Sequence, residues 1–183
     1  MFIQTEQTPN PSTLKFLPGR VVMEKGTMDF ADVDAAQSSP LAKRLFAVEG
    51  VERVFLGADF VTVTKAAPKD WQMLKPAILG GIMEHYTSGE PVIAGEASAS
   101  EGAADEDDEI VAQIKDLLET RVRPAVAQDG GDIVFQDFRD GVVYLHMHGS
   151  CSGCPSSTAT LKMGIENLLK HYVPEVVEVQ AAQ

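Results

Sequence analysis

The sequence predicts an α+β fold made of two small α+β domains joined by an acidic, flexible linker. Residues 94–109 include seven acidic and no basic side chains and are otherwise small, so this segment has nothing to bury and its charges repel. On either side, short apolar runs of strand type alternate with runs of helical period. We therefore assign residues 1–93 to one domain, 94–109 to the linker and 110–183 to a second domain.

Four strands and two helices are predicted in the first domain. The strands are expected over residues 2–6, 13–17, 51–56 and 60–64, and the helices over residues 39–48 and 70–85. Residues 21–24 are expected to extend the sheet after the Pro18-Gly19 break. Trp71 is interpreted as a core or lid aromatic residue rather than one that stacks on a ligand. This domain shows an apolar core and no obvious chemistry.

The sequence of the second domain predicts the order helix, strand, strand, loop, helix. The first helix carries an apolar stripe from Ile110 to Val122, is kinked or interrupted at Arg123-Pro124, and ends at the sequence Asp129-Gly-Gly-Asp132. We interpret that sequence as structural, because glycine takes the left-handed conformation that closes a helix. Expected next are strands over 133–138 and 142–148, a helix through residues 161–172 and a short strand over 176–179.

Cys151 and Cys154 are the only cysteines of the chain and lie between the second strand and the last helix. Pro155 suits the first helical position, which places Cys154 at a helix N-terminus where the thiolate is favoured over the thiol. Two thiolates are half of the four ligands that a tetrahedral zinc site or an iron–sulfur cluster usually takes. A metal or cluster site is therefore expected to need a second copy or a partner.

His146 and His148 alternate with Leu145 and Met147 on the second strand. If the apolar residues face the core, both histidines point outward. A zinc site combining the histidines with the cysteines matches no common structural zinc spacing, so we interpret them as surface residues. Three functions remain open for the two cysteines: cluster binding, thiol–disulfide exchange and structural zinc binding.

Several stretches of the chain resemble the Nfu iron–sulfur carriers and their C-terminal NifU-like domain. In the second half these are Val122-Arg-Pro, Asp129-Gly-Gly-Asp132, Gly149-Ser-Cys-Ser-Gly-Cys-Pro-Ser-Ser-Thr158 and Leu161-Lys-Met-Gly-Ile-Glu-Asn-Leu168. In the first half they are Gln7-Thr-Pro-Asn-Pro11, Leu14-Lys-Phe16, Ser39-Pro-Leu-Ala-Lys-Arg-Leu-Phe46 and Gly50-Val51. The resemblance extends over nearly the whole chain apart from the linker.

The resemblance implies a function in iron–sulfur cluster assembly. It implies that Cys151 and Cys154 ligate a cluster, 4Fe-4S rather than 2Fe-2S, which is shared between two copies of the chain and handed to apo-protein recipients. It also implies a carrier rather than an enzyme, working with upstream cluster-assembly machinery. The C-terminal domain would then have the NifU-like α-β-β-α arrangement, preceded by an Nfu N-terminal domain.

Two other functions are compatible with the same cysteines. A thiol–disulfide oxidoreductase also places Cys-x-x-Cys between a strand and a helix, although no βαβ pattern precedes the motif here. A dimeric structural zinc protein would use the same four sulfurs. Nucleic acid and membrane partners are not expected, because the net charge is −12 and no apolar run is long enough to span a bilayer. The expected location is a bacterial cytoplasm, or the mitochondrial matrix for a processed eukaryotic chain.

Overall fold

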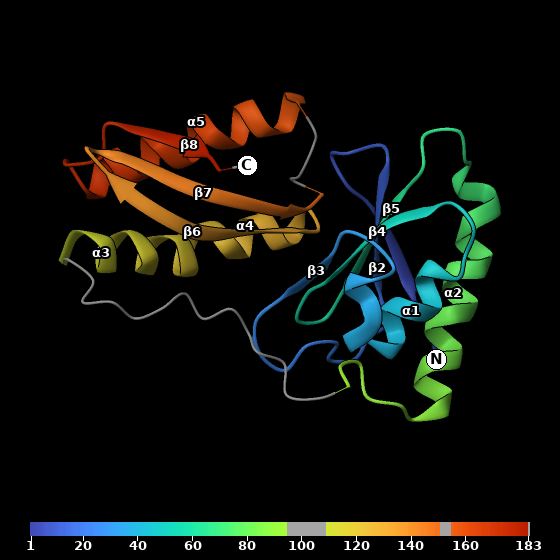
Figure 1. The fold of residues 1–183 in the computed structure, drawn as a ribbon. Coiled ribbons are helices and arrows are strands. Elements are labelled where there is room, and N and C mark those ends of the chain that lie inside the picture. Colours follow the sequence, from blue (N-terminus) through green and yellow to red (C-terminus); the bar gives the residue numbers. More distant parts are fainter. Residues whose placement is uncertain (95–108, 151–154, 183) are drawn as a thin grey trace. The chain divides into compact units, whose positions relative to one another are not determined.

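Figure 1 shows the computed structural model, which describes residues 1–94, 109–150 and 155–182, with only the backbone described for 155–158. The chain divides into two compact units, Met1–Ala99 and Ser100–Gln183. Each unit combines helices with one sheet, so the predicted α+β class is confirmed. Of the predicted linker, only Ala94 and Glu109 belong to the described residues, and 95–108 lie outside them.

The first unit is built on a five-stranded antiparallel sheet in the order β1-β2-β5-β4-β3. Its strands are β1 (Gln4–Gln7), β2 (Thr13–Leu17), β3 (Met28–Phe30), β4 (Val51–Leu56) and β5 (Val61–Lys65). Its helices are the 3-10 helix η1 (Ala35–Ser38), α1 (Pro40–Phe46) and α2 (Trp71–Ser88). Both longer helices and four of these strands follow the pattern expected from the sequence.

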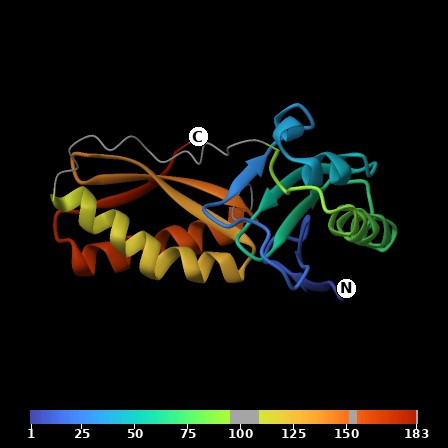
Figure 2. The ribbon, with the colours of Figure 1, turned by 90° about the horizontal axis from the view of Figure 1, so that it is seen from below.

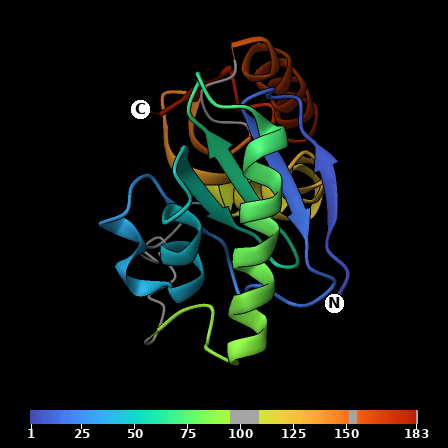
Figure 3. The same cartoon turned by 90° about the vertical axis from the view of Figure 1, so that its right-hand side faces the viewer.

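Both longer helices of this unit begin at a side-chain cap. Ser39 Oγ accepts a hydrogen bond from the Ala42 N–H at 3.1 Å, and Asp70 accepts one from the Gln72 N–H at 3.0 Å. The α2 helix then lies across the sheet (Figure 3). Its apolar face is buried against α1 and the strands through Leu74, Ile78 and Ile82. Helical spacing of apolar residues thus sets which face of α2 is buried.

The expected strand over residues 21–24 is wrong. Val22 and Met23 are buried, but their N–H groups both bond to the carbonyl oxygen of Ala58, at 2.8 and 3.2 Å, instead of forming a ladder. One edge of the sheet is instead formed by β3, which pairs with β4. Trp71 is partly buried against the core as expected, and its indole N–H donates to the Pro11 carbonyl at 3.1 Å.

The second unit is a three-stranded sheet, ordered β6-β7-β8, with its helices packed into a single core. Its elements are α3 (Glu109–Leu117), the π-helical turn η2 (Leu118–Val122), α4 (Arg123–Gln128), β6 (Gly131–Arg139), β7 (Val142–Gly149), α5 (Pro155–Tyr172) and β8 (Glu178–Ala181). Figure 2 shows α3 and α5 on the same side of β6 and β7. The last strand begins two residues later than the sequence suggested.

The first helix of this unit is interrupted where the sequence predicted a break. The turn before Arg123-Pro124 is π-helical, and α4 then continues to Gln128. Gly130 takes the left-handed conformation, with φ 78°, and closes the helix. Gly131 instead begins β6, opposite Gly149. The glycine pair therefore separates its two roles: the first residue ends α4 and the second starts the hairpin.

The hairpin of β6 and β7 is long and antiparallel, whereas β8 joins β7 in parallel after α5. On β7, Val143, Leu145 and Met147 face the core. Glu166 of α5 accepts a hydrogen bond from the Val179 N–H at 3.3 Å and so joins the helix to β8. Among the described residues, no helix is both long and apolar enough to cross a membrane.

Candidate functional site

The cysteine loop follows the end of β7 and precedes the start of α5. Cys151 and Cys154 themselves lie outside the described residues, so their position as predicted ligands is not tested by the structure. The residues on either side are described: β7 ends at Gly149, which has φ 68°, and α5 begins at Pro155. The positive φ at Gly149 is a conformation that residues with a Cβ rarely adopt.

Ser150 fixes the entry to the cysteine loop. Its side chain is buried, its N–H donates to the Gly130 carbonyl at 3.3 Å, and its hydroxyl donates to the Asp129 carbonyl. Both acceptors belong to the turn that closes α4. The residue immediately before Cys151 is therefore held by backbone oxygens about twenty residues earlier in the chain, at the same end of the hairpin.

An ion pair fixes the other side of that turn. Arg123 Nε donates to Asp132 Oδ1 at 2.9 Å, and Arg123 Nη2 donates to Asp132 Oδ2 at 3.0 Å. The same Oδ1 accepts the Ile133 N–H at 2.8 Å. Hydrogen bonding to Asp132 raises the pKa of the Arg123 guanidinium, while partial burial opposes that shift. Asp132 is therefore a structural residue, as the sequence predicted for the Asp129-Gly-Gly-Asp132 segment.

The helix start at Pro155 agrees with the expected first helical position. The first turn of a helix has backbone N–H groups without intrahelical partners, and these favour nearby negative charge. Residue 154 immediately precedes that turn in the chain. The chemistry of this boundary suits a thiolate better than a thiol.

His146 and His148 lie on the sheet face opposite the core, as expected from the alternation along β7. Both are partly exposed, whereas Leu145 and Met147 between and beside them are buried. Their ring centroids are 4.5 Å apart, with the rings inclined at 45°. The alternation along the strand predicted the shared face but not this approach of the rings, which depends on their side-chain torsions.

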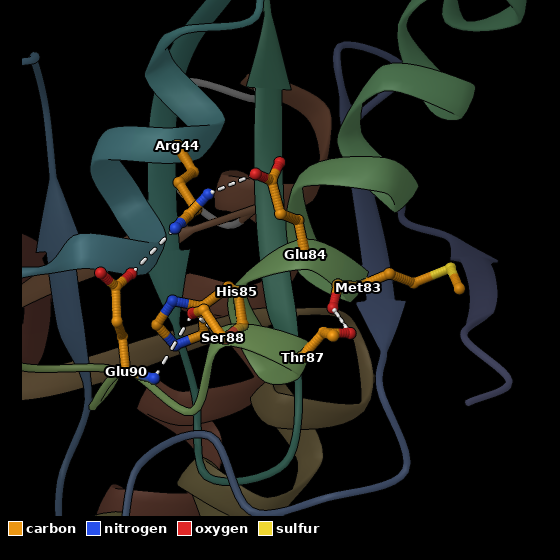
Figure 4. Close-up of polar contacts among 7 residues, drawn as sticks. All are labelled: Arg44, Met83, Glu84, His85, Thr87, Ser88 and Glu90. Carbon is orange, nitrogen blue, oxygen red and sulfur yellow. Dashed lines mark hydrogen bonds and ion pairs between the residues drawn. The ribbon is translucent and has the colours of Figure 1, made fainter.

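A buried histidine in the first unit has a different environment (Figure 4). His85 is fully buried near the end of α2, and neither of its ring nitrogens has a hydrogen-bond partner among the described residues. Close by, Arg44 forms ion pairs of 3.0 Å with Glu84 and with Glu90. Burial lowers the pKa of His85, the charge of Arg44 lowers it further, and Glu90 opposes both effects. The sequence indicated only an ordinary histidine near a helix end.

Two family models match the chain, one in each unit. The model described as "Scaffold protein Nfu/NifU N terminal" matches residues 3–89. The model described as "NifU-like domain" matches residues 114–180. The second match includes the turn at 129–132, the whole hairpin, the cysteine loop and α5.

Curated relatives match the chain along almost its full length. The human "NFU1 iron-sulfur cluster scaffold homolog, mitochondrial" is 53% identical over 181 residues, covering 98% of this chain and 71% of that protein. "NifU-like protein 4, mitochondrial" of Arabidopsis thaliana is 55% identical over 185 residues, covering 98% of this chain and 65% of that protein. The chain thus spans about two thirds of the length of these relatives.

Solved structures also align with the chain, over about half of it. The solution structure of a NifU-like protein from Saccharomyces cerevisiae covers 52% of the chain at 29% identity and a TM-score of 0.48. The crystal structure of protein SAV1430 from Staphylococcus aureus covers 45% at 26% identity and a TM-score of 0.41. The two family models and the near-complete matches to curated relatives show that this chain belongs to the Nfu/NifU family of scaffold proteins.

Proposed function

We propose that this chain binds an iron–sulfur cluster as cargo through Cys151 and Cys154 and transfers it to apo-protein recipients. The observation that carries the proposal is the position of its only two cysteines in the sequence, between β7 and α5 and directly after Ser150, which is bonded to Asp129 and Gly130. The human relative is named an iron–sulfur cluster scaffold, and that name supports the same cargo for this chain.

The cluster is held between two copies of the chain. A two-iron or four-iron cluster usually takes four cysteine thiolates, and one chain supplies two. Two copies therefore complete the ligand set without any other protein. We propose the four-iron type as the cargo, with the two-iron type as the alternative outcome of the experiment below.

A cluster shared by two chains is suited to transfer. Each copy holds only half of the ligands, so separation of the copies exposes the cluster to thiolates of a recipient. Ligand exchange of this kind requires no catalytic group, and we propose that the chain is a carrier rather than an enzyme. Its partners are then a second copy, the machinery that supplies clusters, and apo-proteins that receive them.

The compartment must keep the two thiols reduced, because an intramolecular disulfide would remove both ligands. The matching relatives from Homo sapiens and Arabidopsis thaliana carry "mitochondrial" in their names. We propose the mitochondrial matrix or a bacterial cytoplasm, both of which meet this requirement.

Anaerobic reconstitution with ferric and ferrous iron and sulfide tests the proposal. We expect about four iron and four sulfide ions per two chains, with a change from the apo protein's mass to that of a dimer. Cys151→Ala and Cys154→Ala should each abolish stable loading while leaving the circular dichroism spectrum unchanged. His171→Gln, on an exposed position of α5, is the matched control and should load normally.

Each alternative function gives a different result in the same experiment. Metal bound without sulfide, in particular zinc retained from expression, would indicate a structural zinc site. Absence of iron loading together with reversible disulfide formation between the two cysteines would indicate thiol–disulfide exchange. Unchanged iron and sulfide content in Cys154→Ala would refute the ligand assignment.

A further inference from the structure

The outer face of α2 is apolar although it is exposed. In Figure 3 this helix lies in front of the strands, with its outer side toward the viewer. The solvent-facing side of a surface helix usually carries polar or charged residues. Here every exposed position from residue 73 to residue 83 is apolar: Met73, Pro76, Ala77, Gly80 and Met83. The two methionines are 80% and 44% exposed, so this face has apolar surface that another protein surface could bury.

Gly80 lies in the middle of the outer face, and the packing of the unit does not require it. Its φ is not positive, and a Cβ at position 80 would meet no described atom within 4 Å. The neighbouring Gly81 differs, because its Cβ would contact Leu45 of α1 at 3.6 Å. Glycine inside a helix is destabilising relative to alanine, but it allows another backbone to approach closely. Gly80 therefore suits a point where a second helix crosses α2.

We propose that the outer face of α2 packs against the same face of a second copy of the chain, with the two helices antiparallel and crossing at Gly80. The contact lies wholly in the first unit and is additional to the cysteine site. It does not rest on the proposed function, because no metal or cluster takes part in it.

The outer face is complementary to itself in this arrangement. A contact between identical faces needs each feature of one copy to meet its complement on the other. With antiparallel helices that cross at Gly80, residues equally far before and after Gly80 lie opposite one another. Ala77 of one copy is then opposite Met83 of the other, so a small side chain receives a large one on both sides of the crossing.

The charges beside the outer face favour a second copy in the antiparallel direction. Lys75 precedes Gly80 by five residues, and Glu84 follows it by four. Antiparallel crossing therefore places Lys75 of each copy beside Glu84 of the other, whereas parallel crossing would place like charges together. Glu84 forms an ion pair with Arg44 of its own chain, yet its side chain remains 71% exposed. The antiparallel direction also brings opposite ends of the two helix dipoles together.

The size of the face indicates a weak pair. The 18 residues of α2 make a helix about 27 Å long and about 10 Å wide, so its outer side offers about 300 Å². Stable complexes usually bury about 800 Å² on each partner. We expect a dissociation constant on the order of 100 µM. Even a weak pair raises the local concentration of a second set of cysteines for each copy.

Sedimentation velocity of the full apo chain tests the proposal, with Cys151→Ser and Cys154→Ser so that no cluster or disulfide can form. We expect monomer at about 10 µM and a growing dimer fraction up to about 1 mM. Gly80→Gln should weaken this association by about tenfold or more, because the long side chain blocks close approach. The same change should raise the thermal midpoint of unfolding, since glutamine favours a helix more than glycine does. Lys43→Gln, at an exposed position of α1, is the control and should associate as the parent does.

Cross-linking tests the direction of the helices in the same cysteine-free chain. Gly80→Cys places one thiol of each copy at the crossing, so oxidised glutathione should convert this variant to a disulfide-linked dimer. Met73→Cys exposes a thiol equally well, but antiparallel helices hold the two thiols about 21 Å apart along the axis. That separation exceeds the reach of a disulfide, so Met73→Cys should stay monomeric.

Three results would overturn the proposal. They are a parent chain that stays monomeric up to about 1 mM, equal association of the parent and Gly80→Gln, and cross-linking of Met73→Cys as fast as that of Gly80→Cys. The first would leave the outer face of α2 to a different protein, and the third would indicate parallel helices. None of these results bears on cluster loading of the cysteine-containing chain, so this proposal and the proposed function fail separately.

Discussion

Arg123 and Asp132 form a bidentate ion pair, with nitrogen–oxygen distances of 2.9 and 3.0 Å. Arg123 is the first residue of α4, and Asp132 is the second residue of β6. The pair therefore spans the turn whose carbonyl oxygens, at 129 and 130, receive the hydrogen bonds of Ser150. A change at Arg123 therefore acts on the turn to which Ser150 is bonded.

Replacing Arg123 with lysine should reduce both stability and cluster retention. Lysine keeps the charge but lacks the planar fork, so one of the two bonds to the nearly buried Asp132 carboxylate is lost. We expect a loss of about 1–3 kcal/mol in the free energy of unfolding. Chemical denaturation of the apo protein measures that loss, and the decay of cluster absorbance after reconstitution measures retention.

Arg139→Lys is the matched control for this experiment. Arg139 also pairs with a carboxylate, that of Asp137, but its side chain is 76% exposed. An exposed pair contributes little, so the change in unfolding free energy should stay within about 0.5 kcal/mol. Equal effects of the two substitutions would contradict a special role for the Arg123–Asp132 pair.

Ser150→Ala should shorten the lifetime of the bound cluster more than it lowers stability. The substitution removes the hydroxyl of the buried Ser150 side chain and with it the hydrogen bond to the Asp129 carbonyl. The expected cost is about 1 kcal/mol in unfolding free energy. Thr120→Ala removes a comparable hydroxyl bond, to Asp116, on an exposed helix surface and should leave cluster lifetime unchanged. Identical cluster lifetimes in the two variants would show that Ser150 does not act on the loop.

The stability of the first unit should fall as the pH drops below about 6.5, the value at which histidine titrates in an unfolded chain. Burial lowers the pKa of His85 in the folded state, so below that pH the unfolded state binds a proton that the folded state does not. Above it both states are neutral and the histidine adds no pH dependence. Urea titrations at several pH values between 5 and 7.5 measure the slope of the unfolding free energy against pH.

His85→Leu removes the titrating group and fills a similar volume, so it should flatten the slope in that pH window. His171→Gln, at an exposed position, should keep the slope of the parent. The charges that act on His85 are those of Arg44 and Glu90, and its ring lies edge-on to that of Tyr86, whose pKa is raised by burial. An unchanged slope in His85→Leu would assign the pH dependence to these neighbours.

Separated units test how the proposed function is divided. A fragment from residue 105 to 183 contains both cysteines and the core of the second unit, so it should fold and assemble a cluster alone. Residues 1–93 have their own core and no cysteine, and should fold and bind no iron. We expect loss of the first unit to slow transfer to an apo-protein more than it lowers cluster yield. A 105–183 fragment unable to assemble a cluster would refute this division.

Sequence patterns predicted the elements in which apolar residues recur at regular spacing over several helical turns or along a strand. The alternation along β7 correctly gave its buried face, and the apolar stripe of α2 correctly gave Ile78 and Ile82 as core residues. The edge strand β3 escaped detection because it has three residues, of which only Phe30 is buried. Its position is fixed by pairing with β4 and by the bond from Arg53 to Asp29, at 2.8 Å, neither of which is local in sequence.

In the candidate site, too, features that depend on local sequence were predicted and features that depend on distant contacts were not. The glycine that ends α4 follows from residue type and spacing, and the cysteines stay a prediction of the same kind. The partner of Arg123 and the acceptor of the Ser150 hydroxyl do not, because these bonds form only once α4 and the hairpin have packed. The orientation of the His146 and His148 rings is likewise decided by side-chain torsions that no periodicity encodes.

The parallel pairing of β8 with β7 has a consequence for the order of assembly of the second unit. A parallel pair cannot close until the whole crossover, here α5, has been made. The hairpin of β6 and β7 needs only a two-residue turn, and the bonds from Ser150 to residues 129 and 130 span a short length of chain. Short contacts close first, so during folding the bonds of Ser150 should form before β8 pairs with β7. A chain that ends before β8 should therefore already form them.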